Sequence, residues 1–263
     1  MIRAVETQAD ADEFCRRIAG KPFFAPAMGN HLALFWGNHG STEGFYLLPG
    51  NAALQTRGRS ATLCGALPDP GTVEELTAFF RFTGVERVTC EQPVPHGWPL
   101  RRTLHHFGLA AGEQLPLPPT PPPIAGGRIT LDRAPAMTAV SEQLFPDEQA
   151  EQARFYSVAC TAIAHGIGRC YALRDAGGGI VTSVGCYDRW GGEAYMSAGE
   201  TIAALRGQGL GGWLIVRLAN ELAAAGDRVS FLCEESRLHF YRRLGFIQNE
   251  EFNQYNTKGT ITE

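Results

Sequence analysis

The chain has 263 residues, a 44% hydrophobic share and a formal net charge of −4. This length suits two ordinary domains or one large one, and so apolar a composition excludes global disorder. No basic run indicates nucleic-acid binding, no stretch is long enough to span a membrane or resembles a signal peptide, and seven scattered cysteines without a Cys-x-x-Cys pair favour reduced thiols in a cytoplasmic protein without a metal site.

The first half of the chain reads as a series of short α/β elements. Alternating and β-branched runs predict strands at residues 2–5, 32–36, 44–48, 52–55, 61–67 and 87–91. Apolar residues at helical spacing predict helices at 9–18, 72–82 and 100–107. These elements predict an α/β domain over residues 1–114.

A proline-rich stretch separates the two halves. It runs from Leu115 to Pro123 and is followed by Ala125-Gly126-Gly127. Proline at this density favours extended polyproline geometry and blocks helix. We predict an interdomain linker at 115–127 between domains at 1–114 and 128–263, with a surface loop inside a single domain as the alternative.

The second half shows a clearer order of elements. Strands are predicted at 129–131, 170–173, 180–187, 193–202 and 228–233, with helices at 135–144 and 148–165 between the first two. A further helix begins at Leu210, continues with apolar residues at Trp213, Leu214, Leu218 and Leu222, and stops at Gly226. A short last helix ends at Gly245.

A glycine-rich turn joins the strand at 193–202 to the helix that begins at Leu210. Its sequence is Arg206-Gly207-Gln208-Gly209-Leu210-Gly211-Gly212. Glycines let the main chain bend sharply and let an anion approach the N–H groups at the positive end of the helix. Trp213 stands where a P-loop needs Lys, and the glycine spacing differs from the dinucleotide fingerprint. A phosphate or pyrophosphate is the predicted guest.

Two motifs together resemble the GNAT superfamily of acyl-CoA-dependent N-acetyltransferases. Arg206, Gly209 and Gly211 satisfy the family's Arg-x-x-Gly-x-Gly loop, and the run from Phe240 to Phe246 matches its aromatic-Tyr-x-x-x-Gly-Phe ending. The resemblance covers roughly residue 128 to the end of the chain. It implies an α/β (α+β) fold with a mixed, splayed β-sheet flanked by helices, and acetyl-CoA as co-substrate.

The first half looks like a weaker copy of the same series, which predicts two tandem GNAT-like domains. An unrelated α/β domain is the alternative. The copy carries Leu67-Pro68-Asp69-Pro70-Gly71 where the second half has its glycine loop. Two prolines remove backbone donors, so we expect the first half to bind no pyrophosphate.

The resemblance also assigns the residues that hold acetyl-CoA. Main-chain amides of the loop would bind the pyrophosphate, and the end of the preceding strand would pair with the pantetheine amides. The residues so assigned are Thr201, Ile202, Ala203, Arg206, Gly207, Gln208, Gly209, Leu210, Gly211, Gly212, Ser236 and Tyr241. Family members often carry Asn where this chain has Glu234, so the contact expected there differs.

Acyl transfer to an amine needs a proton donor for the leaving thiolate and a base for the amine. The resemblance implies Tyr241 as the acid. A carboxylate on the strand before the loop is the usual base, and Glu193 is the candidate. Glu200 is an alternative if a bulge turns it to that face, and Asp188 is another.

The sequence therefore predicts an N-acetyltransferase that acts on a primary amine of a small molecule or peptide by direct attack in a ternary complex. The alternative is a non-catalytic acyl-CoA-binding module. No nucleic acid or membrane is expected as partner, and a homodimer is left open.

Overall fold

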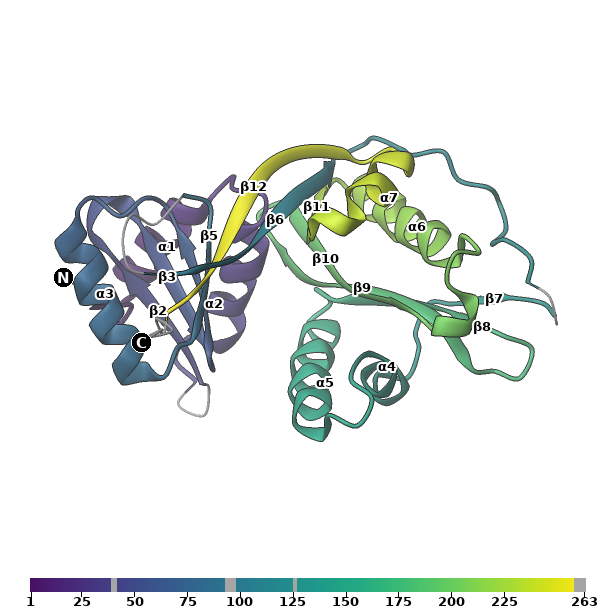
Figure 1. Cartoon of the computed structure of the whole chain (residues 1–263), viewed down its shortest axis with the longest axis horizontal. Coiled ribbons are helices and arrows are strands. Elements are labelled where there is room, and N and C mark those ends of the chain that lie inside the picture. The colour runs from purple at the N-terminus through teal and green to yellow at the C-terminus, as the bar shows by residue number, and fades with distance from the viewer. Residues whose placement is uncertain (39–41, 93–97, 125–126, 258–263) are drawn as a thin grey trace. The chain divides into compact units, whose positions relative to one another are not determined.

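The structure is a computed structural model that describes residues 1–38, 42–92, 98–124 and 127–257. It divides into two compact units that interleave along the chain (Figure 1). Unit 1 comprises Met1–Phe107, Leu232–His239 and Gln248–Glu263, and unit 2 comprises Gly108–Phe231 and Phe240–Ile247. The two consecutive domains expected at 1–114 and 128–263 stay a prediction, because the compactness of a unit does not test which segments fold independently.

Unit 1 is built on a mixed sheet with the strand order β1-β2-β3-β4-β5-β12-β6. Its strands are β1 (Arg3–Ala4), β2 (Glu43–Leu47), β3 (Ala53–Arg57), β4 (Ser60–Cys64), β5 (Arg87–Cys90), β6 (Leu100–Leu109) and β12 (Ile247–Asn256). The pairs from β1 to β4 are antiparallel, β4 and β5 are parallel, and β12 is antiparallel to β5. Its helices are α1 (Gln8–Ile18), α2 (Asn30–Phe35) and α3 (Pro70–Thr83), with a π-helix at Ala25–Gly29.

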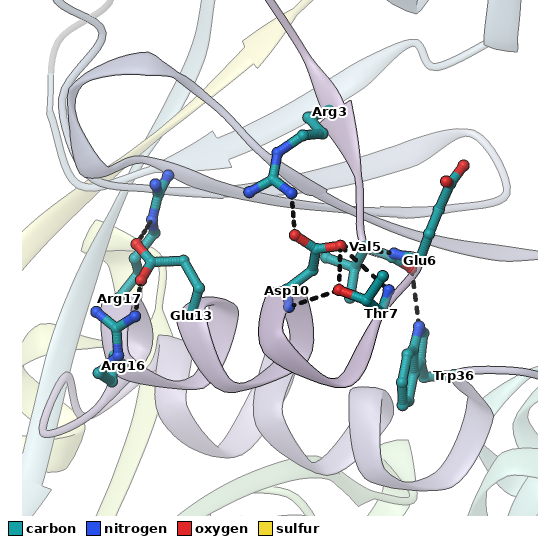
Figure 2. Close-up of polar contacts among 9 residues, drawn as sticks. All are labelled: Arg3, Val5, Glu6, Thr7, Asp10, Glu13, Arg16, Arg17 and Trp36. Carbon is teal, nitrogen blue, oxygen red and sulfur yellow. Dashed lines mark hydrogen bonds and ion pairs between the residues drawn. The ribbon is translucent and has the colours of Figure 1, made fainter.

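Helix α1 begins where the sequence supplies a capping box (Figure 2). The Asp10 N–H donates to Thr7 Oγ1 at 3.2 Å, and the Thr7 N–H donates to Asp10 Oδ2 at 3.1 Å. This exchange satisfies backbone donors that a helix start otherwise leaves unpaired. Phe14 and Ile18 are buried on the sheet side, which fixes the face that α1 presents. At the far end Arg17 donates to Glu13 within the helix.

Two predicted elements of unit 1 are wrong in type. The apolar run 32–36 was expected as a strand, but α2 covers it, continuing from the π-helix before it. Residues 100–107 were expected as a helix because Leu100, Leu104 and Phe107 have helical spacing, but they form β6. The second half of β6 is buried at every position, so burial on both faces replaces the alternation that marks a strand in the sequence.

Unit 2 contains a sheet in which the strands follow the order β11-β10-β9-β8-β7. Its strands are β7 (Thr130–Asp132), β8 (Arg169–Arg174), β9 (Ile180–Trp190), β10 (Glu193–Thr201) and β11 (Arg228–Cys233). Its helices are α4 (Met137–Leu144), α5 (Gln149–Ala164), α6 (Leu210–Ala224) and α7 (Leu238–Arg243). Helices α4 and α5 cover one face of this sheet, and α6 packs on β8, β9 and β10 from the other (Figure 1).

The units share one order of elements. In each, a strand is followed by two helices, three antiparallel strands, a helix and a strand that is parallel to the third (Figure 1). The predicted fold class, a mixed sheet flanked by helices, is confirmed. Among the helices of the described residues, none has the length and apolar character needed to cross a bilayer.

Candidate functional site

The glycine loop lies where the sequence predicts it, between the end of β10 and the start of α6. Gly207 and Gly209 have φ angles of 79° and 81°, in the left-handed region that favours glycine. Gly209 is the N-cap of α6, and no side chain there accepts a hydrogen bond from the first turn. The helix start therefore offers backbone donors and the positive end of the dipole to an anion.

Polar contacts fix this loop onto the end of β10. Arg206 Nε donates to the Thr201 carbonyl at 3.0 Å, and Arg206 Nη2 donates to Glu200 Oε1 at 2.7 Å. The Thr201 hydroxyl lies 2.9 Å from the hydroxyl of Thr182 on β9. Thr182 and Glu200 were missed as supports of the loop, because only the strand register places Thr182 opposite Thr201.

Two further glycines are required by close packing. A Cβ at Gly211 would lie 2.8 Å from Thr201 Oγ1, and one at Gly212 would lie 3.0 Å from Leu244 Cδ2. Both distances are shorter than normal contacts between carbon and its neighbours. The first turn of α6 thus approaches both the end of β10 and the residue that follows α7.

The other residues assigned to the loop differ in exposure. Ile202 donates its N–H to the Val181 carbonyl at 3.0 Å, and Ala203 begins a short 3-10 helix. Gln208 is exposed, whereas the Leu210 side chain is buried in the core, so Leu210 offers only its main chain. Ser236 belongs to unit 1, where it is exposed in a 3-10 helix.

Strands β10 and β11 separate early. They pair in parallel only from Glu193–Tyr195 against Arg228–Ser230. On its other side, β10 is irregular against β9 between Ser197 and Glu200, and Ala198 has a φ of 55°. Glu200 is an alternative base if a bulge turns it to the face of Glu193, and β10 contains a bulge just before Glu200. The later half of β10 leads to the loop without a β11 partner in the described pairing, so β11 does not engage the backbone groups on that edge of β10.

Tyr241 is half-buried on α7 among aromatic rings. Its ring centroid lies 4.4 Å from that of Phe231 and 4.9 Å from that of Phe240. Phe240 also comes within 3.7 Å of the Cβ position at Gly212, so the helix that carries Tyr241 contacts the first turn of α6. The structure thus brings α7 to the glycine loop, as the motif spacing predicts.

Glu193 lies at the opposite end of β10 from the loop. It is 5% exposed, and Arg228 Nε lies 2.9 Å and 3.0 Å from its two carboxylate oxygens. Eight residue steps along a strand separate it from Thr201, or about 26 Å. Both carboxylate oxygens of Glu193 are already engaged by the Arg228 guanidinium. Glu193 stays a predicted base. A test by substitution has to separate a loss of catalysis from a loss of stability caused by breaking the ion pair.

The proline segment, residues 115–123, lies along α6 within unit 2. The Leu115 N–H donates to Asn220 Oδ1 and Asn220 Nδ2 donates to the Leu115 carbonyl, each at 2.9 Å. Trp213 Nε1 donates to the Pro118 carbonyl at 2.9 Å. At the far end, Pro122 Cγ would lie 3.4 Å from a Cβ on Gly209. The segment therefore runs against α6 as far as the glycine loop.

In the described residues, no cluster of His, Cys, Asp and Glu has the grouping of a metal site. Glu234 is exposed and forms an ion pair with Arg102 within unit 1.

Solved structures show that the chain has the GNAT fold over nearly its whole length. A tandem GNAT protein from the clavulanic acid biosynthesis pathway matches with a TM-score of 0.65 at 15% identity, covering 99% of both chains. A GCN5-related N-acetyltransferase from Sphaerobacter thermophilus matches with a TM-score of 0.63 at 14% identity, covering 99% of this chain and 96% of its own. The predicted tandem arrangement is confirmed at the level of the fold.

A Drosophila protein solved by structural genomics is similar as well, with a TM-score of 0.66 at 9% identity over 97% of this chain and 98% of its own. No protein-family model matches the sequence, and no curated protein matches it. The likeness is one of fold, and function has to be argued from the site.

Proposed function

We propose that this protein is an N-acetyltransferase that binds acetyl-CoA at the β10–α6 loop and transfers its acetyl group to a primary amine. The observation that carries the proposal is the uncapped start of α6, with Gly207 and Gly209 in left-handed geometry beside the separation of β10 and β11. A phosphate group fits the loop, and an extended arm fits the strand edge.

The proposed reaction is direct attack in a ternary complex. The amine nitrogen attacks the thioester carbonyl carbon, the C–S bond breaks, and an amide and a free thiol result. Tyr241 gives its phenolic proton to the leaving sulfur, and a carboxylate takes the proton of the amine. Glu193 is the predicted carboxylate, with Glu200 and Asp188 as the alternatives. The acceptor is a small molecule or peptide, and we place the reaction in the cytoplasm.

The second candidate is a non-catalytic acyl-CoA-binding module. The position of Glu193 favours it, because both carboxylate oxygens are hydrogen-bonded to Arg228 and the residue lies at the end of β10 away from the loop. Both candidates share the cofactor site, so binding and turnover have to be measured separately.

Binding is tested by calorimetric titration with acetyl-CoA. Gly207 has open space around its Cβ position, so Gly207→Asp and Gly207→Asn carry the same backbone strain and nearly the same volume. Only the aspartate adds a negative charge next to the pyrophosphate. We expect Gly207→Asn to bind within about threefold of the wild type and Gly207→Asp to lose about tenfold or more, which corresponds to about 1.4 kcal/mol. Equal binding by both variants would overturn the loop assignment.

Turnover is tested by release of free thiol from acetyl-CoA over a panel of primary amines. We expect Tyr241→Phe to lower kcat by about 100-fold, the scale of general-acid catalysis. Acetyl-CoA should still bind, because the variant keeps the ring that packs on Phe231 and loses only the hydroxyl. Binding without turnover for every amine would favour the non-catalytic module.

A further inference from the structure

A cavity of about 500 Å³ lies in unit 2 at the outer edge of β8, separate from the glycine loop. Strand β7 pairs with β8 only as far as Asp132 opposite Ala172. Arg169, Cys170 and Tyr171 continue β8 beyond that point and line the cavity. A volume of this size falls within the range of small-molecule sites in proteins.

The walls of this cavity are mostly apolar. Pro135 and Met137 enter from the start of α4, and Ile163 and Ala164 enter from the last turn of α5. Cys160 lines the same wall and is half-buried. These side chains suit the hydrocarbon body of a ligand.

The charges that line the cavity are both positive. Arg133 Nη1 and Nη2 donate to the two oxygens of Glu221 at 2.9 Å and 3.0 Å, so this guanidinium is matched. Arg169 is half-buried, and its main chain pairs with Cys186 of β9, but its guanidinium forms no hydrogen bond or ion pair with a residue in the described ranges. Neither Asp nor Glu is among the described lining residues. An unmatched cation beside an apolar wall favours a ligand that brings one negative charge.

We infer that this cavity binds a small monocarboxylate with an apolar body, its carboxylate paired with Arg169 and its hydrocarbon against Met137 and Ile163. A guanidinium is suited to a carboxylate because its planar donors match both oxygens. A dicarboxylate would leave its second charge against the apolar wall, and a neutral molecule would leave Arg169 unpaired. The inference does not depend on the transferase proposal, because no residue of the glycine loop lines this cavity.

The test uses octanoate as the probe and 1-octanol as its uncharged match, each titrated calorimetrically into the full chain. Arg169→Gln removes the charge without breaking a side-chain hydrogen bond or ion pair in the described part of the chain, so its melting temperature should stay close to that of the wild type. Arg154→Gln is the control. Arg154 lies on α5, the helix whose last turn lines the cavity, but it pairs with Glu151 at the surface. We expect Arg169→Gln to weaken octanoate binding about tenfold, and Arg154→Gln to leave it unchanged. Binding of 1-octanol should be the same in all three proteins.

Alkylation of Cys160 locates the bound probe. Mass spectrometry should show that octanoate slows modification of Cys160 and leaves modification of Cys15, a half-buried thiol of unit 1, unchanged. The inference is overturned if octanoate binds Arg169→Gln as tightly as wild type, if it does not bind the wild type, or if it binds without protecting Cys160.

Discussion

Glu193 and Arg228 form the ion pair that bridges the paired ends of β10 and β11. The carboxylate is almost fully buried, whereas the Arg228 side chain is 45% exposed. Removing one member of a buried pair costs several kcal/mol, but water screens a pair whose cation is this exposed. The expected contribution is therefore smaller than for a fully buried pair.

We expect Glu193→Gln to lower the free energy of unfolding by about 1–2 kcal/mol, measured by urea denaturation at neutral pH. Arg228→Gln should cost a similar amount, and the double variant should cost less than the sum of the two, because the residues act through each other. If Glu193 is instead the catalytic base, Glu193→Gln abolishes the pH dependence of turnover while the folded fraction stays high. Additive costs in the double variant would contradict a structural pair.

At this scale the sequence identified the residue types of the loop but not their supports. Gly207, Gly209 and Gly211 were predictable from a motif, because the spacing of these glycines along the sequence is itself the signal. Thr182 and Glu200 depend on strand register and on a bulge, neither of which leaves a local signal. The burial of Glu193 against Arg228 depends in the same way on two strands that are distant in sequence and adjacent in space.

The order of strands and helices in unit 2 is the one expected, although β8 and β9 are buried at consecutive positions on both faces. Both strands were predictable because glycine-rich turns bound them, at 166–168, 175–179 and 191–192. Two elements of unit 1, α2 and β6, differ in type from the predicted elements. A strand that is buried on both faces loses its alternation, and a short apolar run is compatible with either element.

The proline segment is the element whose contacts the sequence could least anticipate. Polyproline geometry leaves the backbone unpaired with itself, so its groups need other partners. Asn220 supplies them from α6 with two hydrogen bonds to Leu115.

We expect Asn220→Leu to lower the free energy of unfolding by about 1–3 kcal/mol, because two backbone groups of Leu115 lose their partner. It should also speed proteolysis within residues 115–123. Gln114→Leu is the control, since it removes only the hydrogen bond from Gln114 Nε2 to the Asn220 carbonyl and leaves both Leu115 bonds in place, and it should cost about 1 kcal/mol or less. Equal proteolysis rates in the two variants would show that Asn220 does not hold the segment.

Across the whole molecule the seven cysteines divide by burial. Burial raises the pKa of Cys64 and Cys90 to about 12, and that of Cys170 and Cys233 to about 11. Burial also raises the pKa of Cys186. A raised pKa keeps a thiol protonated at neutral pH, and the thiolate is the reactive form.

At pH 8 we therefore expect Ellman's reagent to modify only Cys160 and Cys15 in the native protein, the two half-buried thiols, with Cys15 the slower because burial raises its pKa. All seven should react once the protein is unfolded in guanidinium. Rapid native modification of Cys233 would contradict this expectation and show that the thiol is more accessible than its burial indicates.

Strand β12 pairs with β5 in unit 1, although it comes after the segments of unit 2 along the chain. Asn253 to Asn256 lie opposite Cys90 to Arg87, and Tyr255 joins the core of that unit. During synthesis, β5 must therefore wait until the residues of unit 2 have been made before its partner strand is available. Until then the edge of β5 that faces β12 is unpaired, and an unpaired strand edge can hydrogen-bond to another nascent chain. The order of synthesis thus makes this edge the place where a chaperone would be needed.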